Sequence, residues 1–239
     1  IFIVILQKFK IYTSKMLSFF KDYKKFAIVF GVISIIIIIL IYNTLNTYKP
    51  LPIYTPARVS TELVDSTIQH QKKYHKIADF SLINQNGKTI TQQDYEDKIY
   101  VADFFFTTCQ TICPIMTDHM VQIQKEIIND DEVMLLSHSV TPEIDTVAQL
   151  KRYAKKKGVI DKKWNLVTGD KKQIYTLARK SYLAVKDNPD AGPYDMVHTE
   201  NFMLIDKKKQ IRGFYDGTKS EDIDRLLADI KHLKKEYTR

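Results

Sequence analysis

Residues 99–114 read IYVADFFFTTCQTICP, and this stretch decides the fold. Residues 99–106 form an apolar and aromatic run of the kind expected for a buried central strand. The run leads directly into Cys109 and Cys113, the only two cysteines of the chain. Beyond Pro114, apolar residues recur at helical spacing. We therefore expect a cysteine pair at the joint between a buried strand and the start of a helix.

Strand and helix patterns alternate through the rest of the chain. Asn86-Gly87 separates two short apolar runs, which is a hairpin signal. Asp145 or Thr146 can cap a helix that stops at Gly158, and Asp170 can cap the next one. Strands alternating with helices, followed by a strand pair and a last helix, predict a three-layer α/β domain. The expected strands are 133–140, 165–168, 202–206 and 212–215, and the expected helices run from 145 to 158, from 170 to 182 and from 220 onward.

The chain also carries an apolar segment near its N-terminus. Residues 26–42 read FAIVFGVISIIIIILIY and contain no charge. Their 17 residues lie at the short end of the length that crosses a bilayer as a helix. A cleaved signal peptide is the alternative, but no A-x-A-like site follows the segment. Lysines precede it at 15, 21, 24 and 25, whereas the next basic residue after it is Lys49. The positive-inside rule then leaves the N-terminus in the cytoplasm and exports the rest of the chain.

These patterns divide the chain into four parts. We expect a cytoplasmic segment at 1–25, a transmembrane anchor at 26–43, a proline-containing tether at 44–76 that becomes ordered near the domain, and the folded domain at 77–239. The first methionine is Met16, and a start there would leave residues 1–15 untranslated.

Composition excludes some classes of function. The formal net charge is +8, but Lys and Arg are spread along the whole chain and form no stripe interleaved with aromatic residues, so we expect no nucleic-acid partner. Two cysteines four residues apart are too few and too close for a secreted disulfide framework. The pair predicts redox or metal chemistry instead.

A cysteine at the start of a helix favours the thiolate, because the positive end of the helix stabilises negative charge. With four-residue spacing over one helical turn, both sulfurs are expected to face the same side, where they can close a disulfide or share a metal ion. Thiolates are soft ligands that suit Cu(I) or zinc. Two thiolates and an imidazole would hold Cu(I) in a trigonal site. The alternative is that both cysteines are small buried hydrophobic residues without chemistry.

The motif Phe106-Thr-Thr-Cys-Gln-Thr-Ile-Cys-Pro resembles the FTxCPxxCP signature of Sco/SenC proteins, and the resemblance covers about residues 77–235. Further matches follow in the family's order: Asp79-Phe-Ser-Leu with Asn86-Gly87, Ser139-Val-Thr-Pro-Glu-Ile-Asp-Thr, Trp164-Asn-Leu-Val-Thr-Gly and His198-Thr-Glu-Asn-Phe-Met-Leu-Ile-Asp.

The resemblance implies a thioredoxin-like fold, and the N-terminal anchor also fits the family. It implies that Cys109, Cys113 and His198 bind copper, as Cu(I) or Cu(II). It also implies that the chain delivers copper to, or reduces, the Cu-A centre of cytochrome c oxidase. The chain departs from the family pattern at Gln110, where proline is usual, and at Thr141, where Asp is common. If that Asp tunes Cu(II) binding in relatives, this chain holds Cu(II) less tightly.

The other histidines have simpler explanations. His119 follows Cys113 on the predicted helix and is expected to be exposed or to pack the helix. His138 lies inside a predicted strand and is expected in the core. His70, His75 and His232 are expected at the surface.

Several functions remain open at this point. The first is a metallochaperone without turnover, and the second is a thiol–disulfide oxidoreductase whose redox dithiol is Cys109 and Cys113, so the residues do not decide whether the chain is an enzyme. A copper or redox sensor is a third possibility.

One sequence feature favours metal binding. Thioredoxin-type reductases place a cis-proline before the strand that faces their cysteines. At that place this chain has His198-Thr-Glu-Asn, and no proline follows. A peroxidase is disfavoured because no Arg is near Cys109 in sequence, and zinc is disfavoured by the exported redox-type fold.

Location and partners follow from these expectations. We expect a single-pass protein of the bacterial inner membrane whose domain lies on the periplasmic side, with a mitochondrial inner membrane as the alternative. The expected partner is the cytochrome c oxidase subunit that carries the Cu-A site, or another acceptor of copper or of a dithiol.

Overall fold

The computed structural model describes residues 23–45, 49–59, 68, 70, 75–185 and 199–238. The chain divides into two compact units, residues 1–49 and residues 50–239. Each unit is considered by itself.

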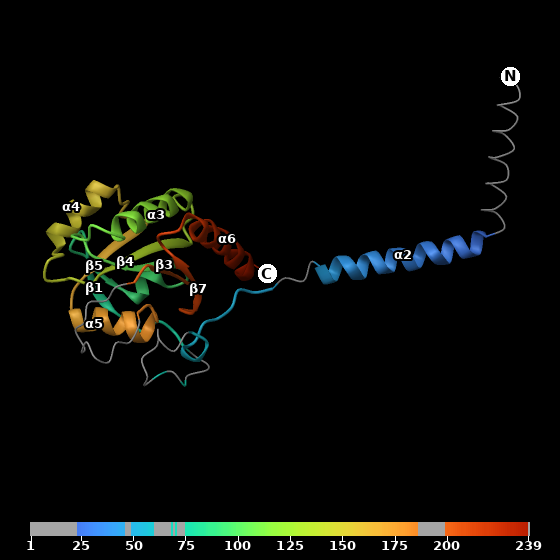
Figure 1. The fold of residues 1–239 in the computed structure, drawn as a ribbon, viewed down its shortest axis with the longest axis horizontal. Coiled ribbons are helices and arrows are strands. Elements are labelled where there is room, and N and C mark those ends of the chain that lie inside the picture. Colours follow the sequence, from blue (N-terminus) through green and yellow to red (C-terminus); the bar gives the residue numbers. More distant parts are fainter. Residues whose placement is uncertain are drawn as a thin grey trace, which may run out of the picture. The chain divides into compact units, whose positions relative to one another are not determined.

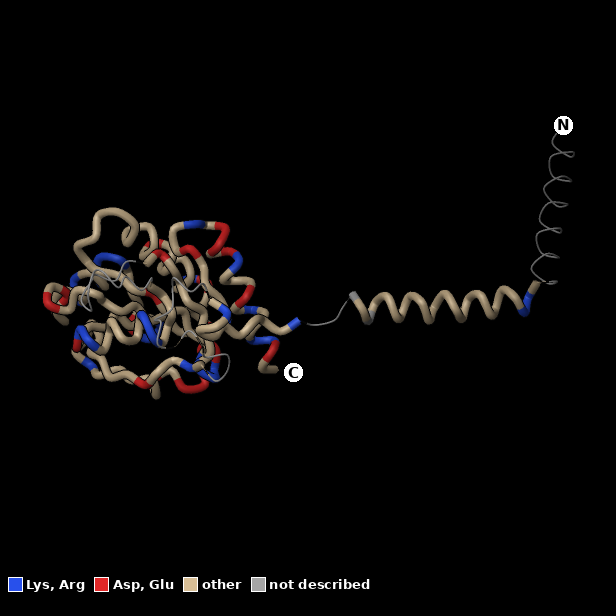
Figure 2. The backbone as a smooth tube through the Cα atoms, turned by 60° about the horizontal axis from the view of Figure 1, so that its bottom comes forward, with Lys and Arg blue, Asp and Glu red and all other residues tan. Residues whose placement is uncertain are grey.

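The described part of the first unit is one helix, α2 (Lys24–Leu45). Its residues Lys24–Tyr42 are long and apolar enough to cross a membrane, and isoleucine side chains along it are about half exposed. Figure 2 shows no charged residue along α2 beyond its start. The helix encloses the segment predicted at 26–43 and is consistent with a membrane anchor.

The second unit is built on a seven-stranded sheet with the order β2-β1-β5-β4-β3-β6-β7. The strands β3, β4 and β5 are parallel, and the outer pairings are antiparallel. The strands are β1 (Ser81–Asn84), β2 (Thr89–Thr91), β3 (Ile99–Phe105), β4 (Val133–Ser139), β5 (Trp164–Thr168), β6 (Asn201–Ile205) and β7 (Ile211–Asp216).

The helices cover both faces of this sheet. In Figure 1, α3, α4 and α6 lie over one face and α5 lies over the other, which gives the predicted three layers. The helices are α3 (Cys113–Glu126), α4 (Val147–Lys157), α5 (Lys171–Thr176) and α6 (Ser220–Tyr237). Short 3-10 turns occur at Pro56–Arg58 and Gln92–Tyr95, and a π-helical turn occurs at Leu177–Ser181.

The central strand β3 is buried along its whole length, as predicted. Alternate side chains enter two separate cores, because successive residues of a strand point to opposite faces. Tyr100 and Phe104 belong to the core under α5. Val101 and Phe105 belong to the core under α3 and α6, together with Cys113. The sheet thus places the cysteine region on the α3 side.

The predicted ends of α4 are confirmed. The side chain of Thr146 accepts a hydrogen bond from the backbone N–H of Gln149 at the start of α4. Gly158 ends the same helix with φ +74°, a left-handed conformation that glycine adopts without a steric cost. The helix predicted from 170 to 182 is capped by Asp170, but its second half widens. The Tyr182 N–H reaches back five residues to the Leu177 carbonyl.

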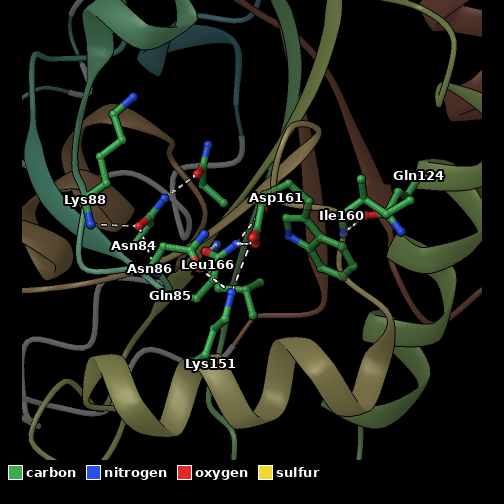
Figure 3. Close-up of polar contacts among 11 residues, drawn as sticks. Asn84, Gln85, Asn86, Lys88, Gln124, Lys151, Ile160, Asp161 and Leu166 are labelled. Carbon is green, nitrogen blue, oxygen red and sulfur yellow. Dashed lines mark hydrogen bonds and ion pairs between the residues drawn. The ribbon is translucent and has the colours of Figure 1, made fainter.

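A polar network holds the β1–β2 hairpin to the rest of the sheet (Figure 3). The Gln85 amide donates to Asp161 at 2.9 Å and to the Trp164 carbonyl at 3.0 Å. Lys151 of α4 reaches both Asn86 and Asp161. The hairpin is therefore fixed by side chains from α4 and from the approach to β5.

Part of the predicted tether packs onto the domain. Tyr54 forms an isolated bridge with Ile211 of β7, and its N–H donates to the Ile211 carbonyl at 2.9 Å. The division of the chain also falls between residues 49 and 50. The tether was expected to become ordered near the domain, but its proline content and missing periodicity did not identify the partners, which lie in β7 and α6.

Arg212 holds this N-terminal segment in place. Its side chain is 3% exposed and forms ion pairs with Asp206 at 2.9 Å and Glu236 at 2.7 Å. The same guanidinium donates to the carbonyls of Leu51 at 2.7 Å and Pro52 at 3.2 Å. Its planar fork of donors suits this set of acceptors. We call Arg212, Asp206 and Glu236 the Arg212 clamp.

Removing the guanidinium is expected to destabilise the domain strongly. Arg212→Ala removes the only cation that pairs with the buried Asp206 carboxylate among the described residues, and it takes a donor from Glu236 and from two carbonyls, which costs about 3–5 kcal/mol for a buried pair. The matched control is Arg225→Ala, because Arg225 pairs with Asp222 but is 49% exposed, and exposed pairs contribute about 0–1 kcal/mol. Urea unfolding of residues 50–239 measures both. Equal losses for the two variants would contradict the clamp.

Candidate metal and dithiol site

The two cysteines lie where β3 ends and α3 begins. β3 ends at Phe105, residues 106–112 form the connection, and Cys113 is the first residue of α3. Pro114 occupies the first turn of the helix, a position where its missing N–H costs nothing. We call residues 107–112 the cysteine loop.

One geometric expectation was wrong. The cysteines do not lie one turn apart on a helix, because Cys109 belongs to the cysteine loop and only Cys113 is helical. The loop curves back, so the Cys109 sulfur still meets the backbone N–H and the thiol of Cys113. Both cysteines are free thiols. The expected meeting of the two sulfurs occurs, but by a loop rather than by helical spacing.

Cys109 carries the thiolate of the pair. Desolvation raises the pKa of this partly exposed thiol, but hydrogen bonds outweigh it and bring the pKa down to about 7. They come from the N–H and thiol of Cys113, and from the hydroxyl and N–H of Thr111. The Cys109 Sγ and the Thr111 hydroxyl are 3.6 Å apart. Cys109 thus accepts a hydrogen bond at the N-terminus of α3, where negative charge is favoured.

Cys113 behaves in the opposite way. It is 4% exposed, and burial is the main reason why its pKa rises to about 12. The Cys109 thiolate adds to this rise, because a neighbouring negative charge disfavours a second one. The lowered pKa expected at this helix start therefore applies to Cys109 alone. Near neutral pH the metal-free pair therefore carries its negative charge on Cys109, which titrates in this range, while Cys113 keeps its proton.

Asp103 lies on the side of β3 that faces Cys113, between Val101 and Phe105. It was not identified as a site residue from the sequence. It is 3% exposed, and burial raises the pKa of its carboxyl to about 7 while a hydrogen bond from Ser137 opposes the rise. Its Oδ1 has no hydrogen-bond partner among the described residues. Its charge also raises the pKa of Cys113. An acid inside the apolar run 99–106 was the signal that could have identified it.

The third predicted ligand, His198, lies outside the described residues. In the described parts of the chain, no cluster of three or more His, Cys, Asp or Glu side chains is able to hold a metal. The residues just after His198 can be placed. Thr199 and Glu200 lead into β6, which pairs antiparallel with β3 through Tyr100↔Ile205 and Ala102↔Met203. This antiparallel pairing places the first residues of β6 beside the C-terminal end of β3.

Gly217 fixes the start of β6 to α3. Its N–H donates to the Glu200 carbonyl at 2.7 Å, and its own carbonyl lies 2.7 Å from Nδ1 of His119 on α3. A Cβ at Gly217 would fall 2.7 Å from the Phe202 ring and 2.9 Å from the Glu200 carbonyl oxygen, so only glycine allows this approach. His119 therefore packs the helix, one of the two roles expected of it.

The remaining histidines separate into core and surface. His138 is fully buried, as expected, and desolvation lowers its pKa to about 4. The expectation for His75 was wrong, because it is 7% exposed and its Nε2 is 2.7 Å from the Ser181 carbonyl. A neutral imidazole can be buried when it donates to such an acceptor. His70 is exposed and His232 is half-buried.

Alkylation should distinguish the two thiols in the reduced, metal-free protein. Because the thiolate is the nucleophile, the iodoacetamide rate at Cys109 is expected to rise with a midpoint near pH 7, the pKa of its thiol. Cys113 should react far more slowly at every pH below 9, because it is buried and stays protonated. Peptide mass spectrometry gives the two rates separately. Faster modification of Cys113 would contradict the assignment, and Cys113→Ser serves as the control for the Cys109 profile.

Comparison with known proteins connects this site to a family. The SCO1/SenC family model matches residues 68–235. The SCO1 protein homolog of Bacillus subtilis is 31% identical over 159 residues, which cover 66% of this chain and 82% of the relative.

Solved structures agree in fold. BsSco, described as having a disulfide switch and as a member of the Sco family of cytochrome c oxidase assembly proteins, is 31% identical with a TM-score of 0.57 over 66% of this chain and 92% of its own. Copper-bound ScoI of Bradyrhizobium japonicum is 26% identical with a TM-score of 0.53 over 67% of this chain and 99% of its own. The domain has the thioredoxin-like fold of these neighbours. With its Cys-x-x-x-Cys joint between β3 and α3, the chain belongs to the SCO1/SenC family.

Proposed function

We propose that this chain is a copper-binding metallochaperone that holds copper through Cys109, Cys113 and His198. One observation carries the proposal: two free sulfurs meet at the start of α3, and one of them is a thiolate near neutral pH. Thiolates are the ligands that Cu(I) prefers. Copper-bound structures among the family neighbours support the same metal.

The donor set fits copper as a cargo that is taken up and passed on. Cys109 is partly exposed, so a metal or a partner can reach it. Cys113 must lose its proton when metal binds, because only the thiolate is a ligand. The pairing of β6 with β3 brings the start of β6 to the end of the sheet where the cysteine loop begins, and this supports the choice of His198, which directly precedes Thr199, as the third ligand. An imidazole there would complete a three-ligand site for Cu(I) and offer nitrogen to Cu(II).

We propose the Cu-A centre of cytochrome c oxidase as the destination of the copper. The support comes from the family, since BsSco is described as a member of the cytochrome c oxidase assembly proteins. Thr141 bears on the binding of Cu(II). Its hydroxyl donates to the Asp145 carboxylate at 3.1 Å, so an Asp at position 141 would face a second carboxylate. Such an Asp would add negative charge beside the cysteine loop, and negative charge favours a divalent cation. Thr141 adds none, which supports weaker Cu(II) binding in this chain than in relatives with Asp.

A second function is favoured by the unequal cysteines. The exposed Cys109 thiolate can attack a disulfide of a partner protein, form a mixed disulfide and release one partner thiolate. Cys113 then loses its proton and attacks Cys109, which forms the Cys109–Cys113 disulfide and releases the second partner thiol. The partner gains two electrons and this chain loses them. Such exchange would prepare cysteines of an acceptor for copper.

The apolar helix α2 supports a single-pass anchor. Lysines at 21, 24 and 25 on its N-terminal side favour a cytoplasmic N-terminus and an exported domain. We propose the bacterial inner membrane, with the domain on the periplasmic side.

Copper titration of the reduced domain, residues 50–239, tests the ligand set. Cys109→Ser and Cys113→Ser should each abolish tight Cu(I) binding. His198→Ala should weaken it and change the thiolate-to-copper charge-transfer absorption of the Cu(II) form. His70→Ala is the matched control, since His70 is an exposed histidine of the tether and should bind one copper like the parent protein.

Two outcomes would contradict the proposal. Stoichiometric copper retained by the double cysteine variant would exclude the cysteine site. Absence of specific copper binding in the parent protein, together with rapid reduction of a protein disulfide, would assign the chain to thiol–disulfide exchange.

A reporter fusion tests the topology. Alkaline phosphatase fused after residue 49 should be active, because it folds only when exported, and a cytoplasmic reporter at the same position should be inactive. The control replaces Lys21, Lys24 and Lys25 by Gln, which should lower the exported fraction if these lysines set the orientation. An active cytoplasmic reporter in the parent chain would overturn the topology.

A further inference from the structure

Asp145 accepts hydrogen bonds from three residues, one of which is the first residue of the cysteine loop. Its side chain is fully buried. Thr107 donates its hydroxyl to Oδ1 at 2.5 Å and its backbone N–H to Oδ2 at 3.2 Å. Ser139, the last residue of β4, donates its hydroxyl at 2.6 Å, and Thr141 donates at 3.1 Å. The carboxylate thus joins the exit of β3 to the exit of β4.

All four donors are neutral groups, which is unusual for a buried carboxylate. A buried charge needs compensation, and hydrogen bonds from neutral donors supply it here. Replacing a buried charged group with a well-packed apolar one is often neutral or stabilising. The stability of the domain alone therefore does not require a carboxylate here, and its position beside the cysteine loop suggests another role.

Thr107 is the residue that Asp145 holds most completely. Both the N–H and the hydroxyl of Thr107 are engaged by Asp145, and its hydroxyl oxygen also accepts from the Gln149 amide at 2.9 Å. Thr107 is separated from Cys109 by a single residue. The backbone of Cys109 itself is held more weakly, by an N–H bond to the Phe106 carbonyl at 3.3 Å. Asp145 therefore fixes the start of the cysteine loop, while α3 fixes its end.

The chemistry of Cys109 depends on this fixed curvature. Its sulfur lies 3.6 Å from the Thr111 hydroxyl and meets the N–H and thiol of Cys113, where the loop turns back to the start of α3. A hydrogen bond weakens steeply when its geometry is lost. We infer that Asp145 is a positioning residue for Cys109, acting through Thr107 to aim the sulfur at the first backbone N–H of α3. This inference rests on the proposed role of the cysteine pair.

A purely electrostatic role of Asp145 would have the opposite sign. A nearby negative charge disfavours a thiolate, so removing it would make Cys109 more reactive. A positioning role requires the reverse, because loss of the carboxylate frees the loop and removes donors from the thiolate. Asp145→Asn is nearly isosteric and tests this sign directly.

The experiment measures the iodoacetamide rate at Cys109 in the reduced, metal-free full chain at pH 7. Asp145→Asn and Thr107→Val should each lower the rate about fivefold or more, because a sulfur that the loop no longer holds at the start of α3 loses the donors that stabilise the reactive thiolate. Thr107→Ser keeps both donors to Asp145 and should react within about twofold of the parent chain. Thr146→Ala is the matched control, because it removes the neighbouring cap of α4 and should destabilise that helix without changing the rate.

An unchanged or faster rate in Asp145→Asn would overturn the inference. If that variant fails to fold, the Thr107→Val and Thr107→Ser pair decides, and equal rates in these two would also overturn it. No copper is present in the assay. A parent chain that bound no copper would therefore contradict the proposed function while leaving the positioning role to be decided by the alkylation rates.

Discussion

The burial of β3 on both faces is the constraint on which the rest of the domain depends. β3 pairs with β4 on one side and β6 on the other, and its side chains alternate between two cores. A strand held in this way cannot shift its register without moving one set of apolar side chains into the other core. The point where β3 ends is therefore fixed. The cysteine loop begins at that point, so the framework of the site is set by core packing rather than by the site residues.

Within this framework, the two cysteines acquire different chemistry from their surroundings. Cys109 lies in a partly exposed loop and receives hydrogen bonds that stabilise its thiolate, whereas Cys113 is buried in the core under α3 and keeps its proton. An exposed thiolate beside a protected thiol suits both proposed activities. It can take up a soft metal ion and release it to a partner, and it can begin disulfide exchange that the second thiol completes.

Much of the architecture could be predicted because its signals are local. The apolar run at 99–106 predicted the central strand, Thr146 and Gly158 predicted the ends of α4, and Asn86-Gly87 predicted the hairpin. The predictions that were wrong concern environment. His75 was expected at the surface and is buried against the Ser181 carbonyl, a partner 106 residues away. The tether at 44–76 was predicted to become ordered near the domain, but its residues did not indicate that Leu51 and Pro52 would bind Arg212.

The sequence by itself determined the order of the elements, the apolar helix near the N-terminus and the presence of two cysteines between a strand and a helix. These features depend on spacing and periodicity over a few residues. Only the tertiary structure decided that Cys109 ionises more readily than Cys113, that Asp103 is held without a full set of partners, and that Asp145 holds Thr107 across 38 residues of chain. The physical reason is that burial and hydrogen-bond geometry depend on groups that meet only after folding. No local pattern records which donors will surround a given sulfur or carboxylate.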